Sequence, residues 1–142
     1  MKIRDGYKKW RVLIGITLLL FVIAGCQSKN KNISNTQEVV NKHNEIENIE
    51  GLNSFVDNVN NQKETEINYV QYGIEGQRGV RTLTFNGEQI NVSHSVDGKF
   101  IEKYNCKNII VKIEKEVKYY VLSQCTGNFN GDLELLSVPI KD

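Results

Sequence analysis

The 142-residue chain has few of the side chains that most catalytic and metal sites need, with two histidines, three cysteines and one proline. It contains no HExxH, GxSxG, P-loop or CxxC pattern. Zinc-protease, nucleophile-elbow, phosphate-cradle and redox sites therefore lack their sequence signals. These absences argue against an enzyme, and the sequence indicates no catalytic residue, no cofactor and no metal site.

A long apolar run is missing as well. The longest, Val12 to Gly25, has 14 residues, whereas a spanning helix needs about 20. Basic residues precede this run, and Ile23-Ala24-Gly25-Cys26 ends it. The pattern resembles a bacterial lipoprotein signal, in which the peptidase cleaves between Gly25 and Cys26 and the Cys26 thiol carries a diacylglycerol. The alternative is an ordinary Cys26 thiol behind an uncleaved anchor.

This resemblance implies a division of the chain into a signal peptide over 1–25, a lipidated tether over 26–35 and a single domain over 36–142. The tether is polar and shows no periodic pattern. Without residues 1–25 the chain has 13 basic and 16 acidic side chains, a formal charge of −3. This balance argues against a nucleic-acid partner, because such domains are strongly basic. The expected location is the extracytoplasmic face of the bacterial membrane.

Two cysteines remain once Cys26 is lipidated, which suits an oxidising compartment. Residues 108–113 and 117–124 both resemble strands, joined near Lys115-Glu116. A hairpin centred there places Cys106 directly opposite Cys125, and Ile109 opposite Leu122. The sequence therefore predicts a disulfide between Cys106 and Cys125. Free thiols or a metal site are the alternatives, and cysteines so far apart without a nearby histidine make a poor zinc site.

Two helices are expected at the start of the domain. The first would begin at Asn35 or Thr36, with Glu38 completing a capping box and Val39, Val40 and His43 on one side. The second is clearer, because Leu52, Phe55, Val56 and Val59 follow helical spacing and indicate packing on a sheet. A groove-binding helix is the alternative. This second helix should end near Asn60-Asn61.

Strand-like alternation follows over 67–74, 80–85 and 89–96, with a turn at Asn86-Gly87. Pairing across this turn places Leu83 opposite Ile90 and Arg81 opposite Val92. A second turn is expected at Asp97-Gly98, then a strand over 100–104, the disulfide hairpin, and an edge strand over 133–138 that ends at Pro139. The other face of the first hairpin is polar and consists of Thr82, Thr84, Gln89, Asn91 and Ser93.

Several short motifs occur together in the domain. They are Val39-Val40-Asn41 with His43, the segment 46–59 with Asn48-Ile49 and Phe55, Ile74-Glu75-Gly76, Asn86-Gly87, and Cys106 with Cys125. With these motifs the domain resembles the uncharacterised small lipoproteins of low-GC Gram-positive bacteria that are grouped as a domain of unknown function. Where the family pattern suggests Gly after the histidine, this chain has Asn44. The resemblance implies no activity.

Few residues are candidates for a functional role. His94 lies in a segment with the alternation of a strand. It is either an ordinary residue on one face of the sheet, or it acts as a base or a ligand. His43 is expected to cap or close the first element. The loop Glu75-Gly76-Gln77-Arg78-Gly79 is either a plain connection or a clamp for a carboxylate or phosphate through Arg78. Glu45, Glu47 and Glu50 could bind calcium, but they lack the EF-hand pattern and are interpreted as a solvated face.

Taken together, the sequence predicts an α+β fold, with one or two N-terminal helices packed on an antiparallel β-meander of about five or six strands and one disulfide. The expected function is a lipid-anchored binding or accessory module at the cell envelope. Its expected partners are the membrane, through the lipid, and an envelope protein or the cell wall. One alternative is an envelope hydrolase, or its inhibitor, that uses His94 or Glu75. The other is a structural surface protein of stress or sporulation.

Overall fold

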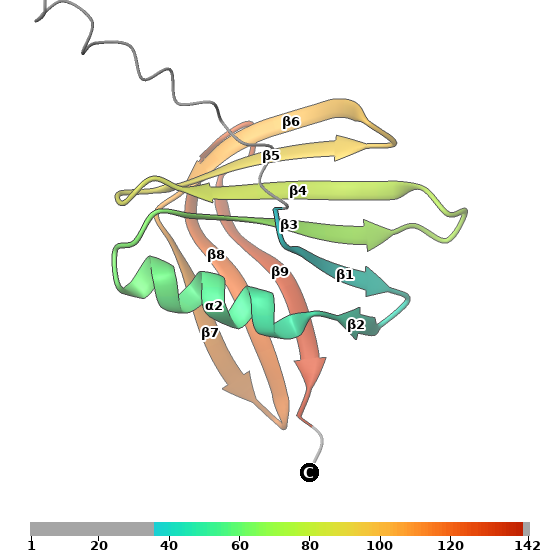
Figure 1. Cartoon of the computed structure of the whole chain (residues 1–142), viewed down its shortest axis with the longest axis horizontal. Coiled ribbons are helices and arrows are strands. Elements are labelled where there is room, and N and C mark those ends of the chain that lie inside the picture. Colours follow the sequence, from blue (N-terminus) through green and yellow to red (C-terminus); the bar gives the residue numbers. More distant parts are fainter. Residues whose placement is uncertain (1–35, 141–142) are drawn as a thin grey trace, which may run out of the picture. The chain divides into compact units, whose positions relative to one another are not determined.

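The computed structural model describes residues 36–140, and these form a nine-stranded, curled sheet that wraps around one helix (Figure 1). The predicted signal peptide, cleavage site, Cys26 lipidation and tether lie outside the described residues. In chain order the elements are β1 Glu38–Lys42, β2 Glu45–Glu47, α2 Ile49–Asn60, β3 Thr65–Tyr72, β4 Arg78–Phe85, β5 Ile90–Val96, β6 Lys99–Cys106, β7 Asn108–Glu114, β8 Val117–Gly127 and β9 Gly131–Pro139.

The strands follow the order β2-β1-β3-β4-β5-β6-β8-β7, and β9 pairs with β8. All pairs are antiparallel except β1 with β3, which the crossover through β2 and α2 makes parallel. Strand β8 joins two parts of the sheet, because its last residues pair with β6 and the rest lies between β7 and β9. Gln124 has a positive φ of 51°, and the pairing of β8 with β9 shifts between Leu122 and Cys125. The strand is irregular at the point where it passes from one part to the other.

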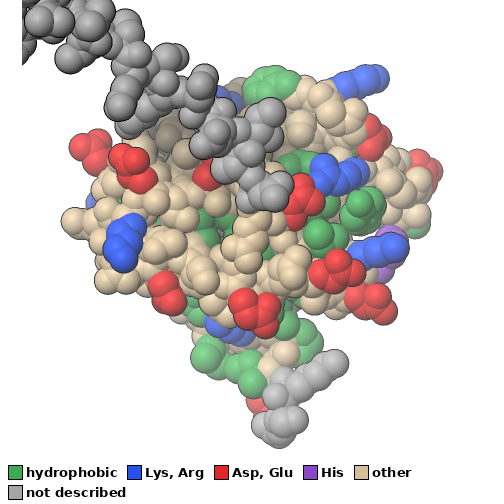
Figure 2. Space-filling model, in the orientation of Figure 1, with side chains coloured by type: hydrophobic (Ala, Val, Ile, Leu, Met, Phe, Trp, Pro, Cys, Tyr) green, Lys and Arg blue, Asp and Glu red, His purple; other side chains and the backbone are tan. Residues whose placement is uncertain are grey.

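The core lies between α2 and the inner face of the sheet. Tyr69, Tyr104, Tyr120 and Phe55 are its largest fully buried side chains. Acidic and basic side chains are interspersed over the face that Figure 2 shows, so this face carries no basic stripe. Within residues 36–140 no helix has the length and apolar character needed to cross a bilayer.

The predicted fold class is wrong. The described residues contain a single short helix, α2, and nine strands in a curled mixed sheet, instead of one or two N-terminal helices packed on a five- or six-stranded antiparallel meander. The segment expected to be the first helix is strand β1, where Val39 is fully buried and Val40 lies on the other side of the strand. His43 and Asn44, with φ of 54° and 74°, form the tight turn into β2. β-Branched residues suit this half-buried strand better than a helix.

Helix α2 confirms the second predicted helix. Its buried residues are Gly51, Leu52, Phe55, Val56 and Val59, and it ends at Asn60 with Asn61 as C-cap. The helix packs on β3, β1 and β7. Asn48 precedes it in a left-handed conformation and donates from Nδ2 to the Glu38 carbonyl over 3.2 Å. This bond connects the start of α2 to β1.

The first hairpin forms with the predicted faces but with a different register. The structure pairs Phe85 with Ile90 and Leu83 with Val92, two residues away from the predicted pairing. The reason lies in the Asn86 side chain, whose Oδ1 accepts hydrogen bonds from the backbone N–H of Glu88 at 3.0 Å and of Gln89 at 2.9 Å. These bonds favour a four-residue loop over a tight Asn-Gly turn. A shift of two keeps each side chain on its face.

The last hairpin confirms the predicted register, with Ile109 opposite Leu122 and Val111 opposite Tyr120. Lys115 and Glu116 both have positive φ, 48° and 63°, so they form a tight turn without the usual Asn-Gly pair. Strand β9 contains the predicted 133–138 segment and ends at Pro139.

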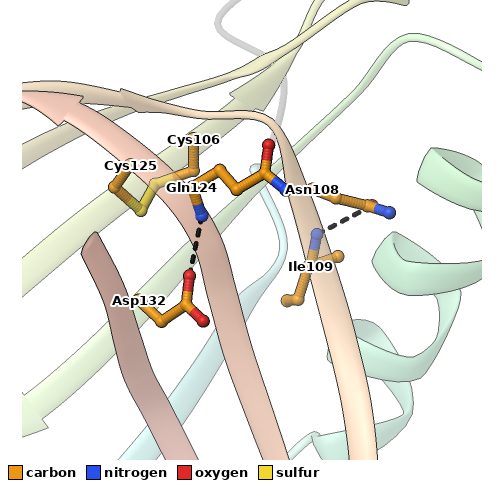
Figure 3. Close-up of a disulfide and its surroundings, with 6 residues drawn as sticks. All are labelled: Cys106, Asn108, Ile109, Gln124, Cys125 and Asp132. Carbon is orange, nitrogen blue, oxygen red and sulfur yellow. Dashed lines mark hydrogen bonds between the residues drawn. A yellow bond between two sulfur atoms is a disulfide. The ribbon is translucent and has the colours of Figure 1, made fainter. Parts of the chain in front are cut away.

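The predicted disulfide is present. Cys106 and Cys125 are bonded, with an S–S distance of 2.05 Å, at the point where β6 ends and β8 approaches it (Figure 3). Beside it, the backbone N–H of Gln124 donates to Asp132 Oδ1 over 2.8 Å. The bond holds the β7–β8 hairpin to the end of β6.

Candidate functional site

A cavity of about 260 Å³ lies at the end of the sheet where β3 and β5 finish and β4 begins. No residue of α2 lines it. The lining residues come from β3, β4, β5 and the β3–β4 connection, and they are Gln71, Tyr72, Gly73, Gln77, Gly79, Arg81, His94 and Val96.

Strand alternation explains why polar side chains reach this cavity. On β4, Phe85 and Leu83 are buried in the core, and the next residue on the same face is Arg81. The register then places Tyr69 opposite Arg81, Arg81 opposite His94, and His94 opposite Glu102. The inner face therefore changes from apolar to polar along the strands. Its polar row runs across β3, β4, β5 and β6 and consists of Tyr69, Arg81, His94 and Glu102.

His94 contacts a carboxylate in this row. Its Nδ1 lies 3.2 Å from Glu102 Oε1, and the two side chains are 15% and 32% exposed. The other ring nitrogen lies beside Gly79, because a Cβ added to that glycine would be 3.7 Å from His94 Nε2. A histidine held by a carboxylate at one nitrogen can accept or donate a proton at the other. The sequence identified His94 as a candidate, and only the pairing of β5 with β6 brings Glu102 to it.

Arg81 has a different environment. Within residues 36–140 the basic side chains that the structure places against a carboxylate are Arg78, beside Glu38, and His94, beside Glu102, so Arg81 has no carboxylate partner there. Its Nε is buried without a hydrogen-bond partner. The sequence analysis missed this residue. A charged side chain on the same face as Leu83 and Phe85 was the available signal.

The Arg81 charge acts on two buried tyrosines, Tyr69 and Tyr104. Burial raises the pKa of Tyr69, and the hydrogen bond that Asn41 Nδ2 donates to its hydroxyl, over 3.2 Å, offsets part of the rise. Burial also raises the pKa of Tyr104, and the Arg81 charge acts in the opposite direction on both phenols. Although the Arg81 charge influences the Tyr104 phenol, the Tyr104 hydroxyl has no hydrogen-bond partner. The inner end of the row thus contains two unsatisfied buried groups, Arg81 Nε and the Tyr104 hydroxyl.

Arg78, the basic residue that the sequence favoured, is engaged elsewhere. Its Nη2 lies 2.8 Å from Glu38 Oε1 and 2.9 Å from Oε2. The bond to Glu38 raises the pKa of Arg78, so the guanidinium stays charged. Glu75 accepts a hydrogen bond from Gln77 over 2.8 Å at the exposed loop. Neither Arg78 nor Glu75 lines the cavity.

The other predicted candidates lie apart from the cavity. His43 is exposed in the β1–β2 turn, where it closes the first element. Glu45, Glu47 and Glu50 are exposed, and residues 36–140 contain no cluster of three metal-ligating side chains. On the polar face, the Thr82 hydroxyl donates to Asn68 over 2.8 Å and the Thr84 hydroxyl to Glu66 over 2.9 Å, whereas Asn105 Oδ1, opposite Asn91, is buried without a partner. Gln89 lies in the loop before β5 instead of on this face.

Comparison with known proteins places the chain in a family whose function is unknown. No curated protein and no solved structure matches the chain. The family described as Domain of unknown function (DUF4362) matches residues 36–120. That range includes the cavity residues and Glu102 but ends before Cys125 and β9. Because the match covers more than half of the sequence, the chain belongs to the DUF4362 family.

Proposed function

We propose that this protein is a lipoprotein held at the extracytoplasmic face of the bacterial membrane through Cys26, and that its domain is a ligand-binding or accessory module. The anchor rests on the basic start, the 14-residue apolar run and Ile23-Ala24-Gly25-Cys26. Two or more acyl chains would hold it firmly, whereas one binds only marginally. The Cys106–Cys125 disulfide supports an oxidising compartment.

The observation that carries the binding role is the cavity with Arg81. A partly buried guanidinium without a carboxylate partner is costly unless something else neutralises it. The cavity contains two glutamines and a histidine besides Arg81, so it offers several hydrogen-bonding groups in a concave site. Such a site suits recognition of a small polar group. The partner would be a cell-wall component or an envelope protein that presents this group.

An envelope hydrolase is the second candidate, and the His94–Glu102 pair favours it. A carboxylate that orients an imidazole is part of many general-base sites. No serine, threonine or cysteine lines the cavity, so water would be the nucleophile. His94→Ala separates the two candidates. A binding module keeps its cellular role with weakened affinity, whereas a hydrolase loses turnover while still binding substrate.

Mass spectrometry of the mature N-terminus tests the anchor. We expect a chain that begins at Cys26 and carries acyl chains, in the membrane fraction. Cys26→Ala should remove the acyl mass, and the matched variant Ser28→Ala should retain it. An unmodified Cys26, or a chain that begins elsewhere, would contradict the proposed anchor.

A further inference from the structure

We infer that the cavity at the end of β3, β4 and β5 binds an oxyanion, a carboxylate or phosphate group, on the Arg81 guanidinium. This inference rests on the proposed binding role and names the chemistry of its ligand. It assigns recognition to Arg81 instead of Arg78, which the sequence favoured.

The first argument compares the two arginines of the described domain. Arg78 and Arg81 are separated by three positions on β4, so they lie on opposite faces of the sheet. Arg78 has Glu38 as its counterion at 2.8 Å. Arg81 has no carboxylate partner within residues 36–140. A guanidinium fork binds carboxylate or phosphate oxygens through paired hydrogen bonds. An external oxyanion would supply the acceptor that the domain itself does not provide.

The second argument is the pair of unsatisfied buried groups. Arg81 Nε and the Tyr104 hydroxyl both lack a hydrogen-bond partner, and Tyr104 is only 2% exposed. Most buried polar groups in folded proteins are satisfied, so two neighbouring exceptions need an explanation. Both groups can donate to an oxygen acceptor. Neither atom is open to solvent in the structure, so a ligand oxygen would reach them only if the Arg81 side chain shifts.

The third argument is the shape and charge of the cavity. Gly79 leaves the wall without a side chain, and a Cβ there would crowd the Gln71 carbonyl at 3.3 Å and lie 3.7 Å from His94 Nε2. No acidic residue lines the cavity, and Glu102 reaches it only through its contact with His94. A volume of about 260 Å³ suits one small charged group better than a large ligand. The remaining lining amides, from Gln71 and Gln77, offer further donors.

The experiment is a titration of the purified full-length protein, in detergent micelles, by isothermal calorimetry. The probes are inorganic phosphate and glycerol phosphate in one arm, and acetate and a dipeptide with a free carboxyl end in the other. The same dipeptide with its carboxyl end amidated is the control, because it lacks the carboxylate. We expect saturable binding in at least one arm and none with the amide. The arm that binds more tightly identifies the source of the oxyanion.

Variants connect binding to Arg81. Arg81→Gln should weaken binding at least about tenfold, and Arg81→Lys should weaken it less, because the charge remains without the fork. The matched control is Arg78→Gln, on the opposite face, which should bind like the wild type. Gly79→Ala should weaken binding by narrowing the cavity. If Arg81→Gln fails to fold, Arg81→Lys and Gly79→Ala still test the site.

The outcomes separate this inference from the proposed function. Equal affinity in the wild type and Arg81→Gln, or no binding in either arm, would overturn the oxyanion site. Saturable binding of the amidated dipeptide that Gly79→Ala weakens would overturn the oxyanion chemistry and keep the binding module. Absence of acylation on Cys26 would overturn only the anchor, since the titration does not depend on it.

Discussion

His94 and Glu102 face each other across β5 and β6, with the imidazole Nδ1 3.2 Å from the carboxylate Oε1. A carboxylate accepts hydrogen bonds and does not donate them when ionised. The neutral imidazole should therefore carry its proton on Nδ1 and leave Nε2 unprotonated beside Gly79. A ligand in the cavity therefore meets Nε2, which can donate to an oxyanion only when the imidazole is protonated at both nitrogens.

The tautomer can be measured directly. Long-range proton–nitrogen NMR on the neutral imidazole should show His94 protonated at Nδ1 in the wild type, and Glu102→Ala should move the proton toward Nε2. Lys103→Ala, the next residue on β6 and on the other face, should leave the wild-type pattern. A wild-type His94 protonated at Nε2 would contradict this geometry.

The disulfide should contribute strongly to stability. Cys106 and Cys125 are separated by 19 positions, and closing a loop of this size restricts the unfolded chain by about 3 kcal/mol. We expect the double variant Cys106→Ala, Cys125→Ala to lose about this free energy of unfolding in urea. Reductant should destabilise the wild type and leave the double variant unchanged. Equal stability of both proteins would show that the hairpin is held without the bond.

The two inner tyrosines should respond differently to loss of the hydroxyl. Tyr69→Phe removes the acceptor of the Asn41 hydrogen bond and should cost about 0.5–1.5 kcal/mol. Tyr104→Phe removes a buried hydroxyl without a partner, so stability should stay equal or rise by up to about 1 kcal/mol. Urea unfolding of the two variants, without added ligand, tests this. A larger loss for Tyr104→Phe than for Tyr69→Phe would mean that the Tyr104 hydroxyl has a partner after all.

The same tyrosines predict a loss of stability at alkaline pH. Burial raises the pKa of Tyr69 and Tyr104 in the folded state, whereas an unfolded tyrosine has a pKa of about 10. The unfolded chain therefore releases protons first as the pH rises. The stability contributed by these groups is fully present below about pH 10 and is lost as the pH rises through the folded-state values.

Free energies of unfolding measured from about pH 8 to about pH 11 should show this loss. The double variant Tyr69→Phe, Tyr104→Phe should show a shallower fall. Tyr119→Phe, which changes a partly exposed ring, is the control and should keep the wild-type slope. An identical slope in all three proteins would contradict the role of the buried phenols.

Asn44 occupies a backbone position that favours glycine, with φ at 74° in the β1–β2 turn. Asn44→Gly should keep or slightly raise the melting temperature, because glycine adopts this conformation without steric cost. Asn44→Val should lower stability by about 1–2 kcal/mol, since a β-branched residue is strained there. Both variants keep the backbone N–H that donates to Asn41 Oδ1. A valine variant as stable as the wild type would argue against strain at this turn.

Parts of the fold governed by neighbouring residues were predictable. Helix α2 follows from the helical spacing of Leu52, Phe55, Val56 and Val59, and these residues are buried as expected. The β7–β8 register follows from a short hairpin centred on Lys115-Glu116, and the cysteine pair agrees with it. In both cases the interacting residues are close in the chain, so periodicity and turn length suffice.

The candidate site was only partly predictable. His94 was identified, but Glu102 was not, because the facing residue depends on how β5 pairs with β6. Arg78 was offered as a possible clamp and Arg81 was not considered, because residues 75–79 were interpreted as a loop with two glycines. Its partner Glu38 is 40 positions away in the sequence, so no local pattern could show that Arg78 is already engaged.

The sequence by itself determined the local elements whose partners are near in the chain, namely α2, the last hairpin and its disulfide, and it carries the lipoprotein signal pattern that the anchor proposal rests on. Only the tertiary structure decided that the Glu38–Lys42 segment is a strand, because its buried Val39 pairs with Tyr69 on β3. It also decided that Arg81 lies unpaired beside a cavity. The physical reason is the same in both cases. Long-range strand pairing determines whether a short apolar segment is a strand and whether a charged side chain has a counterion, and the packing of the whole sheet determines that pairing.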